Sequence, residues 1–304
     1  MNPRKAIRST DGLSLYLKKH GGLIERALNR SLPKSTVRPE TIHQAMRYSL
    51  LAGGKRLRPI LTLAAAEACG AGSLINILPA ACAVEFIHTY SLIHDDLPCM
   101  DDDDLRRGRP TSHKVFGEGV AVLAGDALLT HAFGLLAQTK PSKRYPLNLL
   151  LEETATAAGS LQLIAGQVAD LEAEGKKSSI RDVRFIHERK TAAMFVLALR
   201  LGAMIADAPP KKLKALTEFG KSLGLAFQII DDILDVTQSS EQLGKSAGKD
   251  LSAAKTTYPA VIGMEASLKE AARLTKKAHS ALRDFGSGSD RLTQIAGYLL
   301  GRSS

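Results

Sequence analysis

The amino-acid sequence predicts an all-α protein, a bundle of about ten or more helices without a β-sheet. Long Ala- and Leu-rich stretches repeat their apolar residues at helical spacing. Runs that alternate β-branched or aromatic residues with polar ones, as strands do, are scarce. The breaks between the stretches are short, and none has the biased composition of an interdomain linker. We therefore expect residues 1–304 to form a single domain.

Glycine and proline separate the expected helices. Residues 1–19, at the N-terminus, alternate charges with single apolar residues and are expected to begin the first helix. This segment has no apolar block of a secretory signal, although its basic character leaves an organelle-targeting role open. The strongest helical stretches cover residues 59–69, 78–94, 119–138, 147–174, 180–206, 213–235 and 258–285. The breaks fall at residues 53–54, 70–73, 108–110, 141–146, 175–179, 208–210 and 238–248.

Composition narrows the class of partner. The chain carries 41 Lys and Arg against 31 Asp and Glu, a formal charge of +10, which favours an anionic partner. Tryptophan is absent, no basic tract is interleaved with aromatic residues, and the acids gather in two clusters. These features argue against a nucleic-acid groove and leave diphosphates as suitable anions.

The same composition indicates a soluble, cytoplasmic protein. The longest apolar run, 120–136, is interrupted by Asp126, Thr130 and His131, so we expect no membrane span. The cysteines are odd in number and lack metal-site spacing, which indicates reduced thiols.

The first acidic cluster lies at the end of the helix expected over residues 78–94. So many carboxylates at a helix C-terminus oppose the helix dipole and repel one another, so a cation must compensate; a solvated acidic loop is the alternative. Asp95 and Asp101 would lie about 120° apart on a straight helix. Pro98 between them predicts a kink or bulge that brings Asp101, in preference to Asp102, to the same ion. The cluster consists of Asp95, Asp96, Asp101, Asp102, Asp103 and Asp104.

The second acidic cluster is embedded in an apolar stretch. Its polar residues, Gln228, Asp231, Asp232 and Asp235, share one face of a helix. Carboxylates one turn apart are what Mg²⁺ uses, since it takes one or two of them and keeps its other positions for water and phosphate oxygens. Two such faces opposite each other would hold a diphosphate through bridging metal ions.

Two basic features complete the pattern. Lys55 and Arg58 follow a Gly-Gly turn, where they either bind an oxyanion or form a solvated basic turn. His88 lies two helical turns before Asp95 on the same face, a position that also suits simple packing.

Together these residues resemble the trans-prenyl diphosphate synthase family, and most closely its bacterial farnesyl diphosphate synthases. The two aspartate-rich motifs are residues 94–101 and 231–235, and residues 53–59 resemble the isopentenyl-diphosphate motif. Further matches are Arg106-Arg107-Gly108, Gly166-Gln167-x-x-Asp170, Lys190-Thr191 and Gly248-Lys249-Asp250 with Lys255, in the family's order along almost the whole chain.

The resemblance implies an isoprenoid-synthase fold around a central cavity, a homodimer, and about three Mg²⁺ ions per active site. By resemblance, Asp95, Asp96, Asp101, Asp231 and Asp235 bind the metal, and Lys55, Arg58, His88 and Arg107 hold isopentenyl diphosphate. Arg106 faces the allylic diphosphate. The remaining contacts to that diphosphate or to the developing cation are assigned to Lys190, Thr191, Gln228, Lys245 and Lys255, with Lys249 as an alternative to Lys245. Asp170 would support a metal-bound water.

The implied activity is a head-to-tail condensation of dimethylallyl or geranyl diphosphate with isopentenyl diphosphate. Tyr90 and Ser91 would form the floor of the product tunnel, and the bulk of Tyr90 predicts farnesyl diphosphate. Geranylgeranyl or geranyl diphosphate synthases are the alternatives. A terpene cyclase is disfavoured by the second aspartate motif and by Lys55 and Arg58, and a non-catalytic regulatory homologue by both intact acidic sets.

Overall fold

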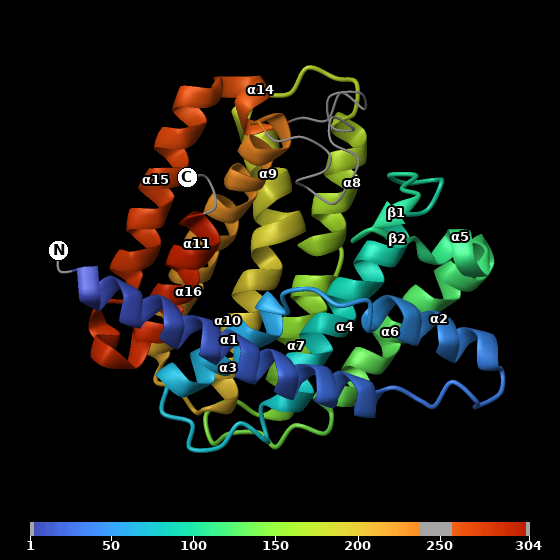
Figure 1. Ribbon diagram of the computed structural model, residues 1–304, viewed down its shortest axis with the longest axis horizontal. Coiled ribbons are helices and arrows are strands. Elements are labelled where there is room, and N and C mark those ends of the chain that lie inside the picture. The colour runs from blue at the N-terminus through green and yellow to red at the C-terminus, as the bar shows by residue number, and fades with distance from the viewer. Residues whose placement is uncertain (1–2, 238–256, 302–304) are drawn as a thin grey trace.

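A computed structural model describes residues 3–237 and 257–301 of the chain. The described part is almost entirely helical, as the sequence predicts, and its long helices stand side by side with α1 crossing their lower part (Figure 1). The first half contains α1 (Pro3–Ser31), α2 (Glu40–Leu50), α3 (Leu57–Ala68), α4 (Leu78–Asp95), β1 (Leu105–Arg106), β2 (Arg109–Pro110), α5 (Ser112–Phe116) and α6 (Glu118–Leu136). The second half contains α7 (Leu147–Ala158), α8 (Leu163–Ala173), α9 (Ile180–Ile186), η1 (His187–Ala192), α10 (Ala193–Ile205), α11 (Pro210–Thr237), α14 (Tyr258–Ile262), α15 (Met264–Ala281), η2 (Arg283–Ser289) and α16 (Asp290–Leu300).

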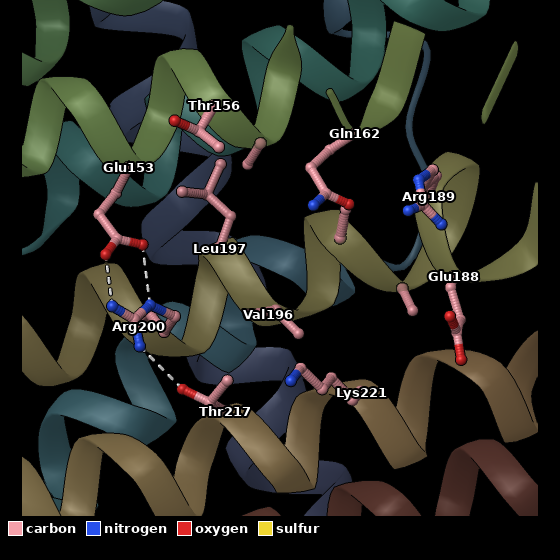
Figure 2. Close-up of a pocket in the computed structure, with 13 residues that line it drawn as sticks. Glu153, Thr156, Gln162, Glu188, Arg189, Val196, Leu197, Arg200, Thr217 and Lys221 are labelled. Atoms are coloured by element: carbon pink, nitrogen blue, oxygen red, sulfur yellow. Dashed lines mark hydrogen bonds and ion pairs between the residues drawn. The ribbon is translucent and has the colours of Figure 1, made fainter. Parts of the chain in front are cut away.

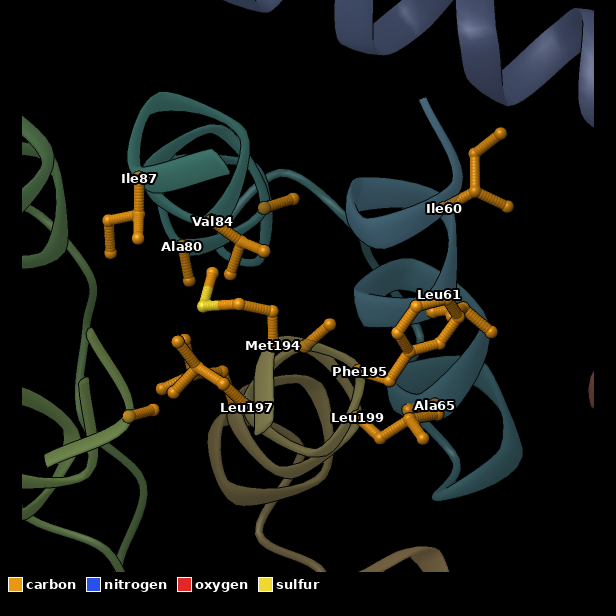
Figure 3. Close-up of a cluster of buried hydrophobic side chains, with 14 of the residues drawn as sticks. Ile60, Leu61, Ala65, Ala80, Val84, Ile87, Met194, Phe195, Leu197 and Leu199 are labelled. Atoms are coloured by element: carbon orange, nitrogen blue, oxygen red, sulfur yellow. The ribbon is translucent and has the colours of Figure 1, made fainter. Parts of the chain in front are cut away.

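Helix α10 lies at the centre of the core and is apolar on nearly every side. It packs against α3, α4, α7 and α11. Met194 points toward Val84 of α4, while Phe195 lies beside Leu61 of α3 (Figure 3). A Cβ at Gly202 would lie 2.0 Å from the carbonyl oxygen of Thr62, so α3 and α10 approach to backbone contact. Each Å² of apolar surface that α10 buries contributes roughly 25 cal/mol to stability, so this central helix stabilises the bundle.

Three stretches expected as single helices are broken. The stretch 258–285 is divided at Gly263, which has φ +82°, into α14 and α15, and it ends within η2. The stretch 147–174 is divided into α7 and α8, since Gly159 adopts an extended conformation with φ −87° and ψ −167°. The stretch 180–206 contains a π-helical turn, η1, between α9 and α10. The expectation of no sheet is wrong at one place, because β1 and β2 form a small antiparallel hairpin. Gly108, at φ +73°, makes the tight turn between its strands.

Among the described helices, α6 is long and apolar enough to cross a bilayer by length and composition alone, and 39% of it is buried inside the fold. The core helix of a soluble protein meets the same criterion. Helix α6 packs extensively on α4 and also contacts α2. Its apolar character therefore serves packing over part of its surface.

Candidate active site

The first acidic cluster is shaped by a tight turn after α4. The helix ends at Asp95, so Pro98 lies beyond it, in the turn. The backbone then folds back, so that the Asp101 N–H donates to the Asp95 carbonyl oxygen at 2.8 Å. This turn brings Asp101 beside Asp95, as the sequence requires, although by helix termination instead of a bulge. Asp102 is exposed, in the left-handed region at φ +47°.

Asp95 and Asp101 lie near the cation of Lys190. Burial raises the pKa of Asp95 to about 6; Lys190 acts in the opposite direction, and Asp101 adds to the rise. Burial acts to lower the pKa of Lys190, which lies on η1, but Asp170, Asp95 and Asp101 together raise it above its ordinary value. Two half-buried carboxylates that repel each other form a site that a divalent cation would stabilise.

Asp96 has a different role from its neighbour. Its carboxylate is buried and accepts hydrogen bonds from the Arg106 guanidinium, including one from Nε at 3.0 Å. Arg106 also contacts Asp103 at 3.2 Å. The structure thus pairs two predicted site residues with each other, where the sequence assigned Asp96 to metal and Arg106 to diphosphate. The physical reason is the β1–β2 hairpin, which returns Arg106 to the end of α4.

The isopentenyl-diphosphate candidates converge around the Gly-Gly turn. Arg107 donates to the carbonyl oxygen of Gly53 and lies over Gly54, where an added Cβ would be 2.6 Å from its guanidinium. Arg58 Nη1 lies 3.4 Å from His88 Nε2. Burial and the surrounding arginines lower the pKa of His88 well below its ordinary value, so His88 is neutral at pH 7. The structure therefore gathers Arg58, His88 and Arg107 into one basic group.

Lys55 and Arg56, which precede Arg58 in the sequence, differ sharply in burial. Lys55 is exposed, with Nζ 6.0 Å from the ring centre of Tyr298. Arg56 is only 4% exposed and bonds Glu25 at 2.6 Å and Glu85 at 2.7 Å. Sequence reasoning assigned no role to Arg56. Its two acidic partners lie 31 and 29 residues away, so no local pattern could have found them.

The π-helical turn η1 carries the central contacts of the site. Lys190 Nζ donates to Asp170 Oδ2 at 2.6 Å, and Thr191 Oγ1 donates to Gln228 Oε1 at 2.9 Å. The turn is held by backbone contact, because a Cβ at Gly166 would lie 2.2 Å from the Lys190 nitrogen. Lys190 thus connects to α8 and Thr191 to α11. Such π turns recur at functional sites.

The second acidic cluster continues from Gln228 along α11. Asp231 and Asp235 are half-buried. Burial lowers the pKa of Arg58, whereas Glu85 and Asp231 raise it, which places Asp231 close to the basic group. Because Lys190 lies near the first cluster and Thr191 is bonded to the helix of the second, η1 links both acidic sets and the basic group in one region.

Asp232 faces away from this region. Its carboxylate is buried and accepts hydrogen bonds from the Tyr258 backbone N–H at 2.9 Å and from Gln228 Nε2 at 3.2 Å. His187 Nε2 lies 3.5 Å from Asp232, and the His187 ring stacks on Tyr258 at 5.3 Å. Burial raises the pKa of Asp232 to about 8 and lowers that of His187 to about 4. Sequence reasoning did not find this inner layer, since Asp232 shares a helical face with the other acids.

The remaining predicted residues are placed as follows. Tyr90 is 5% exposed, and its hydroxyl donates to the Ala158 carbonyl oxygen at 3.5 Å. Ser91 Oγ donates to the carbonyl oxygen of His88 on its own helix at 2.9 Å. Lys245, Lys249 and Lys255 lie outside the described residues.

Beyond the prediction, Asp102, Asp104 and His113 each bring one ligand atom within 4.8 Å of the others. Asp104 also pairs with Lys114 at 2.7 Å.

Comparison with known proteins identifies close relatives. The polyprenyl synthetase family model matches residues 39–287. The chloroplastic heterodimeric geranylgeranyl pyrophosphate synthase large subunit 1 of Arabidopsis thaliana is 48% identical over 292 residues, which are 94% of this chain and 78% of the relative. A geranylgeranyl diphosphate synthase of Cyanophora paradoxa is 43% identical over 304 residues, covering 99% of this chain and 100% of the relative. The apo crystal structure of an FPP/GFPP synthase from Zymomonas mobilis superposes with a TM-score of 0.83 at 33% identity, covering 95% of this chain and 99% of that one.

Proposed function

Because the chain belongs to the polyprenyl synthetase family, we propose that this prenyltransferase condenses isopentenyl diphosphate head-to-tail with an allylic diphosphate, in the presence of Mg²⁺. The observation that carries the proposal is η1, where Lys190 lies near the first acidic set and Thr191 bonds the helix of the second. A single turn therefore stands beside both acidic sets that a diphosphate would require. This arrangement suits the departure of an anionic leaving group.

The residues fit Mg²⁺ by their chemistry. Asp95 and Asp101 on one side, with Asp231 and Asp235 on the other, offer the oxygen donors that this ion prefers. Asp96, which the resemblance also assigns to the metal, bonds Arg106, and Asp232 accepts from the Tyr258 N–H, so we place these two carboxylates behind the other four as ligands. When bound, Mg²⁺ supplies charge neutralisation for the allylic diphosphate.

Isopentenyl diphosphate is assigned to the basic group. Arg58 and Arg107 offer guanidinium forks for a diphosphate, and neutral His88 adds a hydrogen bond without a charge. Lys55 is exposed and adds a further cation beside the Gly-Gly turn. These donors suit a diphosphate bound directly by side chains.

The reaction then follows from these placements. The bond between C1 of the allylic substrate and its diphosphate oxygen breaks, and C4 of isopentenyl diphosphate bonds to C1. A proton leaves the new chain and passes to the released diphosphate, because no dedicated side-chain base lies in the described part of the site. Lys190, held by Asp170, stabilises the charge that develops on the leaving group. The Lys190 carbonyl and the Thr191 hydroxyl, which is oriented by Gln228, direct dipoles at the allylic cation.

Geranylgeranyl diphosphate is the product that we place first, because two relatives carry that activity in their names. Farnesyl diphosphate, which the motif resemblance implies, is the second candidate. It is favoured by one observation, the buried Tyr90, whose ring meets that of His94 edge-on near the end of α4 and whose hydroxyl bonds Ala158 of α7. A ring there shortens the space that a growing chain can fill.

A homodimer is the assembly that we propose. Val122 and Leu123 on α6 are 39% and 59% exposed, on a helix otherwise apolar enough for burial. A second copy would cover such a face. The cytoplasmic location expected from the sequence has no support from the comparisons, since one relative is named as chloroplastic. The compartment stays a prediction that a fluorescent fusion would test.

The function is tested by mass analysis of products formed from isopentenyl and dimethylallyl diphosphates, with Mg²⁺ and with a chelator. We expect prenyl diphosphates of fifteen or twenty carbons (about three or four five-carbon units) only when Mg²⁺ is present. The lengths decide between the two product candidates. A cyclic hydrocarbon formed from farnesyl diphosphate alone would instead identify a terpene cyclase, and no product from any combination would identify a non-catalytic homologue.

A further inference from the structure

A cavity of about 500 Å³ lies between α7, η1, α10 and α11 (Figure 2), and no aspartate lines it. None of the residues assigned above to metal or to either diphosphate lines it. Lys190 and Thr191 lie on the other faces of the same turn that contributes Arg189 and Ala192 to the cavity. A cavity of this size is large enough for a small organic ligand.

The floor of the cavity is apolar and made mainly of small side chains. Ala157 comes from α7, and Ala192, Ala193, Val196 and Leu197 follow one another along η1 and α10. Small residues at these positions leave the space open. A flexible hydrocarbon chain would bury apolar surface against this floor.

The acidic groups around the cavity are already neutralised. Glu153 accepts hydrogen bonds from Arg200, which also donates to Thr217 at 2.9 Å, so these three residues form a closed wall (Figure 2). Glu188 is paired with Arg184 at 2.8 Å. The cavity therefore presents little unpaired negative charge to a ligand.

One cation on the rim keeps its donors available. The Arg189 guanidinium lies 3.6 Å from the ring centre of Phe185, and no carboxylate of the described residues lies within 4 Å of it. Stacking on a ring fixes the guanidinium plane and leaves its N–H edge free for an anion. Lys221 on α11, an exposed residue paired with Glu218 at 3.3 Å, adds positive charge across the opening.

We propose that this cavity binds a single-chain amphiphile with an anionic head, the head on Arg189 and the chain along Ala193, Val196 and Leu197. A phosphate ester suits the guanidinium fork best. Because Arg189 directly precedes Lys190 on η1, occupancy also alters the turn that carries the Lys190–Asp170 pair. That coupling to chain elongation rests on the proposed function, whereas the binding does not.

Calorimetric titration of the full chain with dodecyl phosphate, in chelator, tests the binding independently of catalysis. The aspartate region can take the same probe, so the number of binding events is compared between variants. Arg189→Gln is expected to weaken one event about tenfold, Arg189→Lys to restore most of it, and Ala193→Leu to block it by filling the floor. Arg273→Gln, on α15 away from the cavity, is the matched control and should bind like the wild type.

Thermal unfolding of each variant separates lost binding from lost folding. Identical titrations of wild type, Arg189→Gln and folded Ala193→Leu would overturn the proposal, as would inorganic phosphate binding as tightly as dodecyl phosphate. Dodecanoate and farnesyl monophosphate are titrated in parallel, because the natural ligand could be a fatty acid or a prenyl phosphate. Tighter binding of farnesyl monophosphate supports a prenyl phosphate, and tighter binding of dodecanoate supports a fatty acid.

Discussion

Lys190 on η1 and Asp170 on α8 form an ion pair of 2.6 Å that crosses the central part of the site. The pair sets where the ammonium lies, since the lysine stem alone leaves several rotatable bonds free. Asp95 and Asp101 also stabilise the same ammonium electrostatically. The position of the Lys190 ammonium therefore depends both on its ion-pair partner, Asp170, and on the first acidic set, which the substrate would approach.

Replacing Asp170, the ion-pair partner of Lys190, should lower turnover. Asp170→Asn removes a charge-assisted hydrogen bond, and we expect kcat to fall on the order of tenfold to a hundredfold. Glu172→Gln changes an exposed acid on the same helix and should leave kcat unaltered. Steady-state assays of both variants at saturating Mg²⁺ make the comparison. Equal turnover in Asp170→Asn and wild type would mean that Lys190 needs no partner.

Gly54 separates the effect of Arg107 from that of backbone strain. In Gly54→Ala the new Cβ would lie 2.6 Å from the Arg107 guanidinium, so Arg107 must move. We expect the KM for isopentenyl diphosphate to rise about tenfold, with a smaller change in kcat. Gly70→Ala is the control, because Gly70 also has a positive φ, of +94°, but nothing within 4 Å of its Cβ position. A similar KM in the two variants would contradict a role for Arg107 in binding this substrate.

Gly166 tests the packing of η1. A methyl group there would meet the Lys190 backbone nitrogen at 2.2 Å, and backbone cannot rotate away as a side chain can. Gly166→Ala should lower both the melting temperature and kcat, with a cost of about 1–3 kcal/mol for the overpacking. Gly134→Ala, on α6 with open space at its Cβ, should not be destabilised. Differential scanning calorimetry and product assays measure the two effects, and unchanged values for Gly166→Ala would refute the close contact.

His187 predicts a dependence of stability on acid pH. Its folded pKa of about 4 lies below the ordinary value of 6.5, and burial is the main cause, with Asp170 acting against it and Lys190 with it. Below pH 6.5 the unfolded chain takes up a proton that the folded chain does not. Stability is therefore lost as the pH falls from 6.5 to about 4, by about 3 kcal/mol in total for this group.

The variant His187→Phe keeps a ring against Tyr258 and removes the titrating group. Its free energy of unfolding should fall less steeply than that of the wild type between pH 6.5 and 4, as measured by urea denaturation of metal-free protein. His279→Gln, on α15, is expected to keep the wild-type slope. Parallel curves for His187→Phe and wild type would show that His187 does not contribute to the acid dependence.

Tyr90 tests the tunnel floor. Tyr90→Ala removes this buried ring, and the products should lengthen by about one or more five-carbon units. Tyr90→Phe removes only the hydroxyl that bonds Ala158 and should leave the product length unchanged. Mass analysis compares the two. The floor assignment fails if Tyr90→Ala yields the same chain lengths as the wild type.

Local patterns were enough to predict the helices and the two acidic sets. Helical spacing depends on near neighbours, so the apolar period located α4 and α11 and placed Asp231 and Asp235 on one face. The break between α7 and α8 was missed because apolar residues continue through Gly159 and give no change of period. The π turn was missed for a similar reason, since one extra residue barely disturbs the pattern.

The pairing of charged residues could not be predicted from the sequence. The motifs assign Asp96 to metal and Arg106 to a diphosphate. In the structure the two side chains bond each other, because the β1–β2 hairpin folds back on α4. Arg56 stands between two candidate ligands, Lys55 and Arg58, but its partners come from distant helices. Which charge meets a substrate and which is neutralised inside the protein depends on tertiary contacts, and those leave no trace in local spacing.

The π-helical turn at residues 187–192 has a consequence for how this chain tolerates length changes. A single-residue deletion there would let the turn relax to ordinary α geometry and rotate everything on one side by about 100° relative to the other. Either Lys190 and Thr191 would leave their partners, or the apolar faces of α10 would turn out of the core. A substitution in this turn changes one side chain. Deletion of one residue from it would change how the site residues before α10 are oriented relative to the core packing of α10.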